Sequence, residues 1–141
     1  MVTREQALDV LNKFRENKPM KFFNKVDETS AGMNFVLVYL SEHSDDVYAS
    51  TIAEKMQISR ARVAVLIQKL INKGFIQKSI SNLDGRIEVL RLTPLGEREV
   101  NAFKEYMLSN VTKLIERIGL KETYNFIETL EKVKNILEEI E

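Results

Sequence analysis

Apolar residues recur at intervals of three and four positions along most of the chain, a spacing typical of helices with one buried face. In the segment TREQALDVLNKF, Thr3 and Gln6 form a capping-box pattern, and Pro19 ends the region. Further along, Ser59 can cap a helix, and Gly74 stands where a left-handed residue would end it. The predicted helices cover residues 3–14, 31–43, 47–56, 60–73, 95–118 and 121–140, with Thr29 or Ser30 as the cap of the second.

The pattern changes between residues 75 and 92, where two short segments are rich in β-branched and apolar residues. FIQKSI and IEVLRL are joined by a polar stretch that contains Asp84-Gly85, which predicts a β-hairpin. Thr93-Pro94 then has the pattern of a helix start. The order of elements predicts a mainly α fold with a small β-hairpin: a winged helix-turn-helix flanked by N- and C-terminal helices.

The two C-terminal helices carry apolar stripes that something must cover. The expected stripes comprise Val100, Phe103, Met107, Val111, Leu114 and Ile118 in one helix, and Ile127, Leu130, Val133, Leu137 and Ile140 in the other. The chain could fold these helices back on itself. A second copy could also cover them in a two-fold interface.

Composition narrows the classes of protein that fit. The 141 residues are 44% hydrophobic and 30% charged, which favours a folded chain. No run of about 18 apolar residues exists, and MVTREQALDV lacks the apolar core of a signal peptide. We therefore expect no membrane partner and a cytoplasmic location. The absence of cysteine excludes disulfides and thiolate metal sites, and a single histidine, His43, excludes a multi-histidine metal site.

Residues that could carry catalysis form no recognisable constellation. Asp45-Asp46 and Glu138-Glu139 are typical of a solvated loop and a helix end, and His43 beside Glu42 is typical of an exposed helix end. We find no nucleophile–base pair, phosphate-binding glycine loop or metal-ligand cluster. The sequence therefore predicts that the protein is not an enzyme and needs no cofactor.

Charge is unevenly distributed although the net charge is zero. Residues 55–83 contain six basic residues and no acid, which leaves 15 basic and 21 acidic residues in the remaining chain. A basic patch on an acidic body is the electrostatic footprint of a nucleic-acid-binding protein. The alternative is a solvated lysine-rich helix; the length of the run without an acid favours the patch.

The predicted helix 60–73 has two distinct faces. Val63, Leu66, Ile67 and Leu70 should pack inward, whereas Ala61, Val65, Gln68 and Asn72 face outward beside a row of cations formed by Arg62, Lys69 and Lys73. Such a helix can enter a major groove about 12 Å wide. We expect Arg60, Ala61, Arg62 and Gln68 to read bases and Val65 to meet a thymine methyl group. Phosphates should be held by Lys69, Lys73 and either Ser50 or Thr51, together with backbone amides. The alternative for the two arginines is contact with solvent or phosphate.

The hairpin tip carries Asp84, Gly85 and Arg86. A hairpin beside a groove-reading helix reaches toward the adjacent minor groove, where the negative potential attracts arginine. Arg86 is placed for that contact, and Asp84 could orient its guanidinium group. Alone, the motif would indicate only a tight turn with a solubilising arginine; after a helix-turn-helix, the DNA contact is favoured.

Residues 35–100 resemble the multiple antibiotic resistance regulator (MarR) family of transcription factors. The resemblance lies in Ile52-Ala53, Ile58-Ser59, Leu70, Lys73-Gly74-Phe75-Ile76, the Asp84-Gly85-Arg86 wing and the segment LRLTPLGE. It implies a homodimer on a pseudo-palindromic operator, with the helix that starts at Ser59 in the major groove and Arg86 in the minor groove. It also implies that residues 1–30 and 97–141 are helical dimerisation segments around a DNA-binding lobe at residues 31–96.

The resemblance further implies release from double-stranded DNA by a small aromatic ligand. Phe22, Phe23, Phe35 and Tyr39 could line a pocket, but core packing is favoured for each, so no effector site is assigned. The chain departs from the family at Gly85, where a second arginine is common, at Tyr48, which weakens a capping role, and at Val65, where a basic residue is frequent. The leading hypothesis is a transcriptional repressor; the alternative is a winged-helix protein-interaction module without DNA binding.

Overall fold

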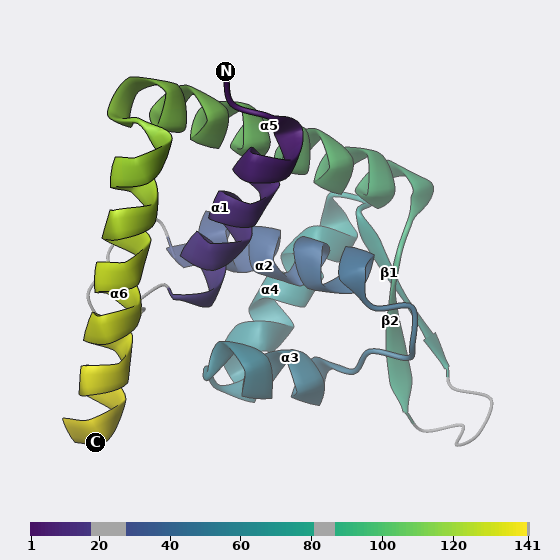
Figure 1. Cartoon of the computed structure of the whole chain (residues 1–141). Coiled ribbons are helices and arrows are strands. Elements are labelled where there is room, and N and C mark those ends of the chain that lie inside the picture. The colour runs from purple at the N-terminus through teal and green to yellow at the C-terminus, as the bar shows by residue number, and fades with distance from the viewer. Residues whose placement is uncertain (18–27, 81–86, 141) are drawn as a thin grey trace. The chain divides into compact units, whose positions relative to one another are not determined.

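A computed structural model describes residues 1–17, 28–80 and 87–140, which form six helices and a two-stranded antiparallel sheet (Figure 1). The elements are α1 (Arg4–Glu16), α2 (Glu28–Glu42), α3 (Ala49–Met56), α4 (Arg60–Asn72), β1 (Ile76–Ile80), β2 (Glu88–Leu92), α5 (Pro94–Ile118) and α6 (Leu120–Ile140). The predicted fold class and order of elements are confirmed. The cap predicted for the second helix is wrong, because α2 already begins at Glu28 and both Thr29 and Ser30 are helical.

The chain divides into two compact units. Val26–Ala102 form the winged-helix unit, and Met1–Lys25 with Phe103–Glu141 form the terminal unit. Each unit has its own cluster of buried apolar side chains.

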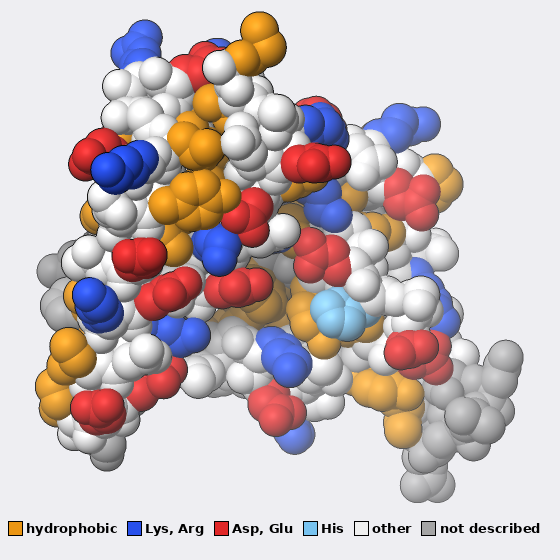
Figure 2. Space-filling view, in the orientation of Figure 1, with side chains coloured by type: hydrophobic (Ala, Val, Ile, Leu, Met, Phe, Trp, Pro, Cys, Tyr) orange, Lys and Arg blue, Asp and Glu red, His pale blue; other side chains and the backbone are white. Residues whose placement is uncertain are grey.

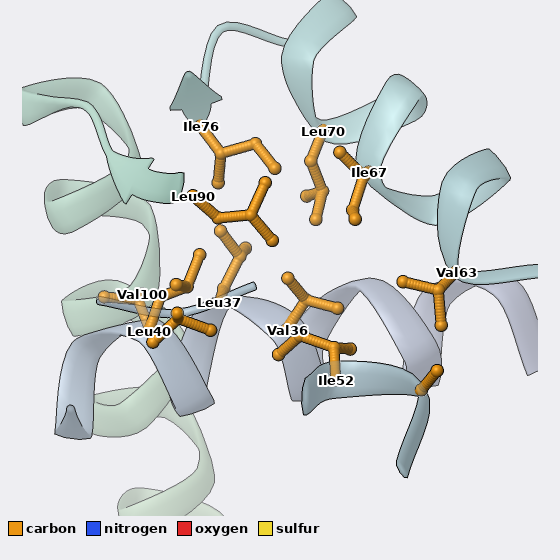
Figure 3. Close-up of a cluster of buried hydrophobic side chains, with 12 residues drawn as sticks. Val36, Leu37, Leu40, Ile52, Val63, Ile67, Leu70, Ile76, Leu90 and Val100 are labelled. Carbon is orange, nitrogen blue, oxygen red and sulfur yellow. The ribbon is translucent and has the colours of Figure 1, made fainter. Parts of the chain in front are cut away.

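The core of the winged-helix unit draws side chains from all of its elements. Figure 3 shows them converging: Val36, Leu37 and Leu40 from α2, Ile52 from α3, Val63, Ile67 and Leu70 from α4, Ile76 from β1, Leu90 from β2 and Val100 from α5. The inward face predicted for residues 60–73 is confirmed, since Val63, Leu66, Ile67 and Leu70 are all buried. Burying each large aliphatic side chain contributes about 1.5–3 kcal/mol, so this core fixes the orientation of α4.

The hairpin runs in a register that pairs Ile76 with Leu92 and Ile80 with Glu88. The two strands lie side by side at the edge of the winged-helix unit (Figure 1). A β-bridge joins Leu90 to Val47, whose carbonyl oxygen accepts a hydrogen bond of 2.8 Å from the Leu90 amide. The predicted helix 47–56 therefore begins two residues late, at Ala49, because Val47 is engaged with the hairpin.

The start of α5 is held against the end of α4 by a short network around Thr93. The Thr93 hydroxyl donates to the Gly74 carbonyl oxygen (2.5 Å) and accepts from the Gly96 amide (3.0 Å), and the Thr93 amide donates to the Phe75 carbonyl oxygen (3.0 Å). Gly74 has a φ of 79°, the left-handed conformation predicted for it. Gly96 approaches so closely that a Cβ atom built on it would lie 1.9 Å from the Phe75 carbonyl oxygen.

In the terminal unit, α1 and α6 are joined by contacts of buried and polar residues. Thr3 caps α1 in the predicted capping box with Gln6. The Tyr124 hydroxyl donates to Asp9 (2.6 Å), which raises the pKa of Tyr124. The buried core comprises Ala7, Val10, Leu108, Val111, Ile115 and Ile127.

The apolar stripes predicted for α5 and α6 are only partly buried. Leu114, Ile118 and Ile140 are exposed, whereas Leu108 and Ile115, which the predicted stripe omitted, are buried. In the terminal unit, the exposed large apolar residues of the helices are Leu8, Tyr106, Leu114, Ile118, Phe126, Ile136 and Ile140. We call this set the terminal apolar face.

Candidate nucleic-acid interface

The turn between α3 and α4 depends on one residue in a left-handed conformation. Gln57 has a φ of 55°, and its amide donates to the Glu54 carbonyl oxygen, while the next amide, that of Ile58, donates to the Ala53 carbonyl oxygen. Non-glycine residues adopt this conformation only occasionally. Sequence reasoning missed Gln57, because nothing in its residue type or spacing marks a left-handed position.

The start of α4 is capped as predicted. The Ser59 hydroxyl oxygen accepts a hydrogen bond of 3.2 Å from the Arg62 amide. This cap satisfies one of the amides that an N-terminus leaves without a helical partner. It also fixes the first turn of α4, which carries Arg60 and Arg62 on the exposed side.

The exposed face of α4 has the composition that the sequence predicted. Ala61, Val65, Gln68, Lys69 and Asn72 are exposed, and Val65 leaves 54% of its surface in contact with solvent. The Gln68 amide nitrogen donates to the Asn72 side-chain oxygen at 2.9 Å, a contact that sequence reasoning missed. This bond orients the Gln68 amide along the helix. If Gln68 recognises a base, its hydrogen bond to Asn72 must be replaced by one to the base.

One cation of the hairpin forms an ion pair between the two strands. Lys78 pairs with Glu88 at 3.2 Å, so one of the six cations of residues 55–83 is neutralised by an acid just outside that run. Within the described ranges, Arg60, Lys69 and Lys73 have no carboxylate within 4.0 Å. Figure 2 shows acidic and basic side chains interspersed on the side that it presents.

The first turns of α3 and α4 contain no acidic residue. A helix N-terminus without acids presents amides and a positive dipole end to an anion. Ser50 is exposed and Thr51 half-buried in the first turn of α3. Tyr48 stands at the N-cap of α3 and its side chain makes no capping bond, which confirms the weakened capping role. The geometry here suits a phosphate.

Several predicted residues lie outside the described residues. They are Asp84, Gly85 and Arg86 of the hairpin tip, and Phe22 and Phe23. Ile80, the last residue of β1, and Ile87, just before β2, are both exposed.

The aromatic residues of α2 form a stack along the helix. Tyr39 packs against the core as expected, but Phe35 is 39% exposed, so the core role predicted for Phe35 is wrong. Their ring centroids are 6.1 Å apart, and Tyr39 stacks on His43 at 3.9 Å. His43 is exposed one residue beyond the end of α2, as predicted, and its Nδ1 lies 2.8 Å from the Tyr39 carbonyl oxygen.

The winged-helix unit contains a shallow cavity of about 150 Å³. Met33, Leu37, Leu70 and Phe75 provide its apolar walls, and Ser30, Asn34, Lys73 and Glu99 its polar ones. Within the described part of the chain, no group of three or more acidic or histidine side chains is arranged to hold a metal ion. None of the described helices combines the length and apolar character needed to cross a membrane.

Comparison with known proteins identifies proteins that are similar to this chain. Residues 34–87 match the MarR family. The uncharacterized HTH-type transcriptional regulator YdgJ of Bacillus subtilis (strain 168) is 25% identical over 105 residues, which cover 74% of this chain and 64% of the relative. The chain thus spans less than two thirds of the length of that curated relative.

Solved structures with low sequence identity share the fold. A variant of MepR from S. aureus has a TM-score of 0.65 at 21% identity and covers 92% of this chain and 93% of its own. The heme sensor protein PefR from Streptococcus agalactiae, in complex with heme, has a TM-score of 0.62 at 22% identity, with coverages of 94% and 89%. A further transcription regulator has a TM-score of 0.74 at 15% identity, and the match covers 94% of this chain and 93% of the regulator.

Proposed function

We propose, on the basis of the match between residues 34–87 and the MarR family, that the protein is a sequence-specific DNA-binding transcriptional repressor. The observation that carries the proposal is the exposed face of α4. It is bordered by cations, it begins at a capped N-terminus without acids, and its opposite face is locked into the core. The proposal includes a cytoplasmic location and no catalytic activity.

In the proposed complex, α4 lies in the major groove with its first turn toward the base edges. Arg60 and Arg62 read guanines, and Lys69 and Lys73 contact phosphates. The N-terminus of α3, with Ser50 and Thr51, holds a further phosphate. Arg86 of the wing enters the adjacent minor groove, oriented by Asp84. Neutralising about 4–8 phosphates would make the affinity fall steeply with salt.

We expect replacement of Arg62 by alanine to change sequence preference as well as affinity, because an arginine that reads a base discriminates by about 1–3 kcal/mol. Selection of bound sequences with wild type and variant would show relaxed preference at one position of each half-site. Lys69→Ala is the matched control: losing a phosphate contact weakens binding about equally on all sequences and lowers the salt slope by about 1. An equal loss on all sequences for Arg62→Ala would demote Arg62 to a phosphate contact. If neither variant changed DNA binding, while both retained a protein partner, the interaction-module alternative would be favoured.

The proposal includes a homodimer, in which a second copy covers the terminal apolar face. Seven large apolar side chains are exposed on the helices of the terminal unit, and a large exposed apolar patch marks an interaction surface. A two-fold interface would place two copies of α4 on neighbouring turns of a duplex.

Two aspartates on this face should separate the subunits. Leu114 and Ile118 lie four residues apart on α5, and both are exposed. We expect the double variant Leu114→Asp, Ile118→Asp to sediment as a folded monomer and to bind a full operator at least tenfold more weakly, because buried unpaired charges oppose association. Ser109→Asp, which adds one charge at an exposed polar position of α5 on a different side of the helix from Leu114 and Ile118, should leave the dimer intact. A double variant that remains dimeric would contradict the assignment of this face.

Release from DNA by a small aromatic ligand completes the proposal. The heme complex of PefR shows that a protein of this fold binds a ligand. The cavity in the winged-helix unit combines apolar and polar walls, as ligand pockets do. A ligand that prefers the non-binding conformation by about 1–3 kcal/mol would reduce DNA affinity about five- to 150-fold.

A further inference from the structure

The connection between α2 and α3 touches the hairpin through two consecutive residues. The Asp46 carboxylate accepts a hydrogen bond from Nη2 of Arg91 at 2.6 Å, and the next carbonyl oxygen, that of Val47, accepts from the Leu90 amide at 2.8 Å. Asp46 belongs to an acidic pair that the sequence indicated to be a solvated loop; the structure shows that it has a specific partner. We call these two contacts the wing tether.

The wing tether connects β2 to the loop between α2 and α3, and so links the hairpin to the rest of the winged-helix unit. A two-stranded hairpin is marginally stable by itself, and this one is exposed along most of β1, beyond the buried Ile76. From Arg91 to Ile87, the described residue nearest the tip on this side, the extended chain spans about 13 Å. A rotation of the hairpin by about 10° at its base would therefore move that end by about 2 Å.

We propose that Asp46 and Arg91 are positioning residues that hold the wing at a fixed angle to α3 and α4. This inference rests on the proposed DNA-binding function, because the fixed angle matters when α4 occupies the major groove and the wing must reach the neighbouring minor groove. The side chain of Asp46 is 38% exposed and that of Arg91 44% exposed, so the pair is only partly screened by water. The backbone bond of the tether limits translation of β2, and the ion pair limits its rotation.

The hairpin itself supplies a matched control. Lys78 and Glu88 form an ion pair of 3.2 Å between the two strands, with side chains 41% and 60% exposed. That pair connects the strands to each other and makes no connection to the loop between α2 and α3. Removing it changes the charge of the wing without removing the tether.

Because the sequence contains no cysteine, one cysteine introduced into the hairpin can carry a single probe. Ser79 is exposed on β1, so Ser79→Cys can carry one nitroxide label at a unique site. In the labelled protein without DNA, we expect Asp46→Asn and Arg91→Gln to increase label mobility, and Glu88→Gln to leave it unchanged. Circular dichroism would establish that each variant is folded. An unchanged spectrum in both tether variants would overturn the proposal.

The same variants without the label test the consequence for DNA. We expect Asp46→Asn to weaken operator binding about three- to tenfold, roughly the effect of losing one partly exposed ion pair and the order that it imposes. The reversed pair, Asp46→Arg with Arg91→Asp, should recover most of the affinity. In an Arg86→Ala background, Asp46→Asn should have little further effect, because both act through the wing.

The outcomes separate this inference from the proposed function. A wild-type protein that binds no duplex would remove the proposed function, and the label spectra would still decide whether the tether fixes the wing. A mobile label with unchanged affinity, or additive losses with Arg86→Ala, would overturn the positioning role. Increased label mobility in the tether variants, together with a loss of affinity that is not additive with Arg86→Ala, would support the positioning role.

Discussion

Replacing Gly96 with alanine is expected to destabilise the winged-helix unit by at least about 3 kcal/mol, the upper part of the range for overpacked sites. The added Cβ would lie 1.9 Å from the carbonyl oxygen of Phe75 and 2.8 Å from its carbonyl carbon. The obstacle is backbone, which cannot rotate away as a side chain can. Relief would require breaking the hydrogen bonds of Thr93 that hold α5 to the end of α4. Thermal unfolding should show a midpoint lower by more than about 10 °C.

Gly32 provides the matched control for this prediction. Its Cβ would meet the Leu66 side chain at 2.9 Å, and that side-chain end can shift. Alanine also favours the helical conformation by about 1 kcal/mol over glycine. We expect Gly32→Ala to remain within about 1 kcal/mol of wild type. If Gly96→Ala unfolded at the same temperature as wild type, the close packing of α5 against Phe75 would be wrong.

Replacing Arg86 with alanine is expected to weaken operator binding at least tenfold while the protein stays a folded dimer. A charged contact in the minor groove contributes about 1–3 kcal/mol, and the narrow groove strengthens it. Titration of a labelled duplex at fixed salt measures the loss, and sedimentation measures the dimer. Gln77→Ala, at an exposed position of β1, is the control and should bind like wild type. Unchanged binding by Arg86→Ala would refute the minor-groove contact.

Local patterns in the sequence predicted the helices well because their causes are local. Ser59 caps α4 since a serine hydroxyl reaches the amide three residues on, and Gly74 adopts a positive φ that glycine tolerates. The inward face of α4 follows from the helical repeat. For the same reason the candidate interface on the opposite face could be predicted almost entirely from spacing.

The contacts that were missed join residues far apart in the chain. Asp46 and Arg91 are 45 residues apart, and no local sequence pattern around either residue predicts that they pair. Val47 was assigned to a helix because its apolar character fits one, but pairing with Leu90 satisfies its backbone better. Leu114 and Ile118 extend the apolar spacing of α5, yet periodicity alone does not say how much of a stripe one chain can cover.

Selection of bound sequences from random duplexes tests the central claim most directly, because it asks whether two copies of α4 and its wing read neighbouring turns of DNA. We predict enrichment of two inverted half-sites whose centres lie about 10 base pairs apart, one helical turn, with A·T-rich sequence where the wings reach the minor groove. Failure to enrich any sequence, or half-sites separated by a distance unrelated to the helical repeat, would contradict the account.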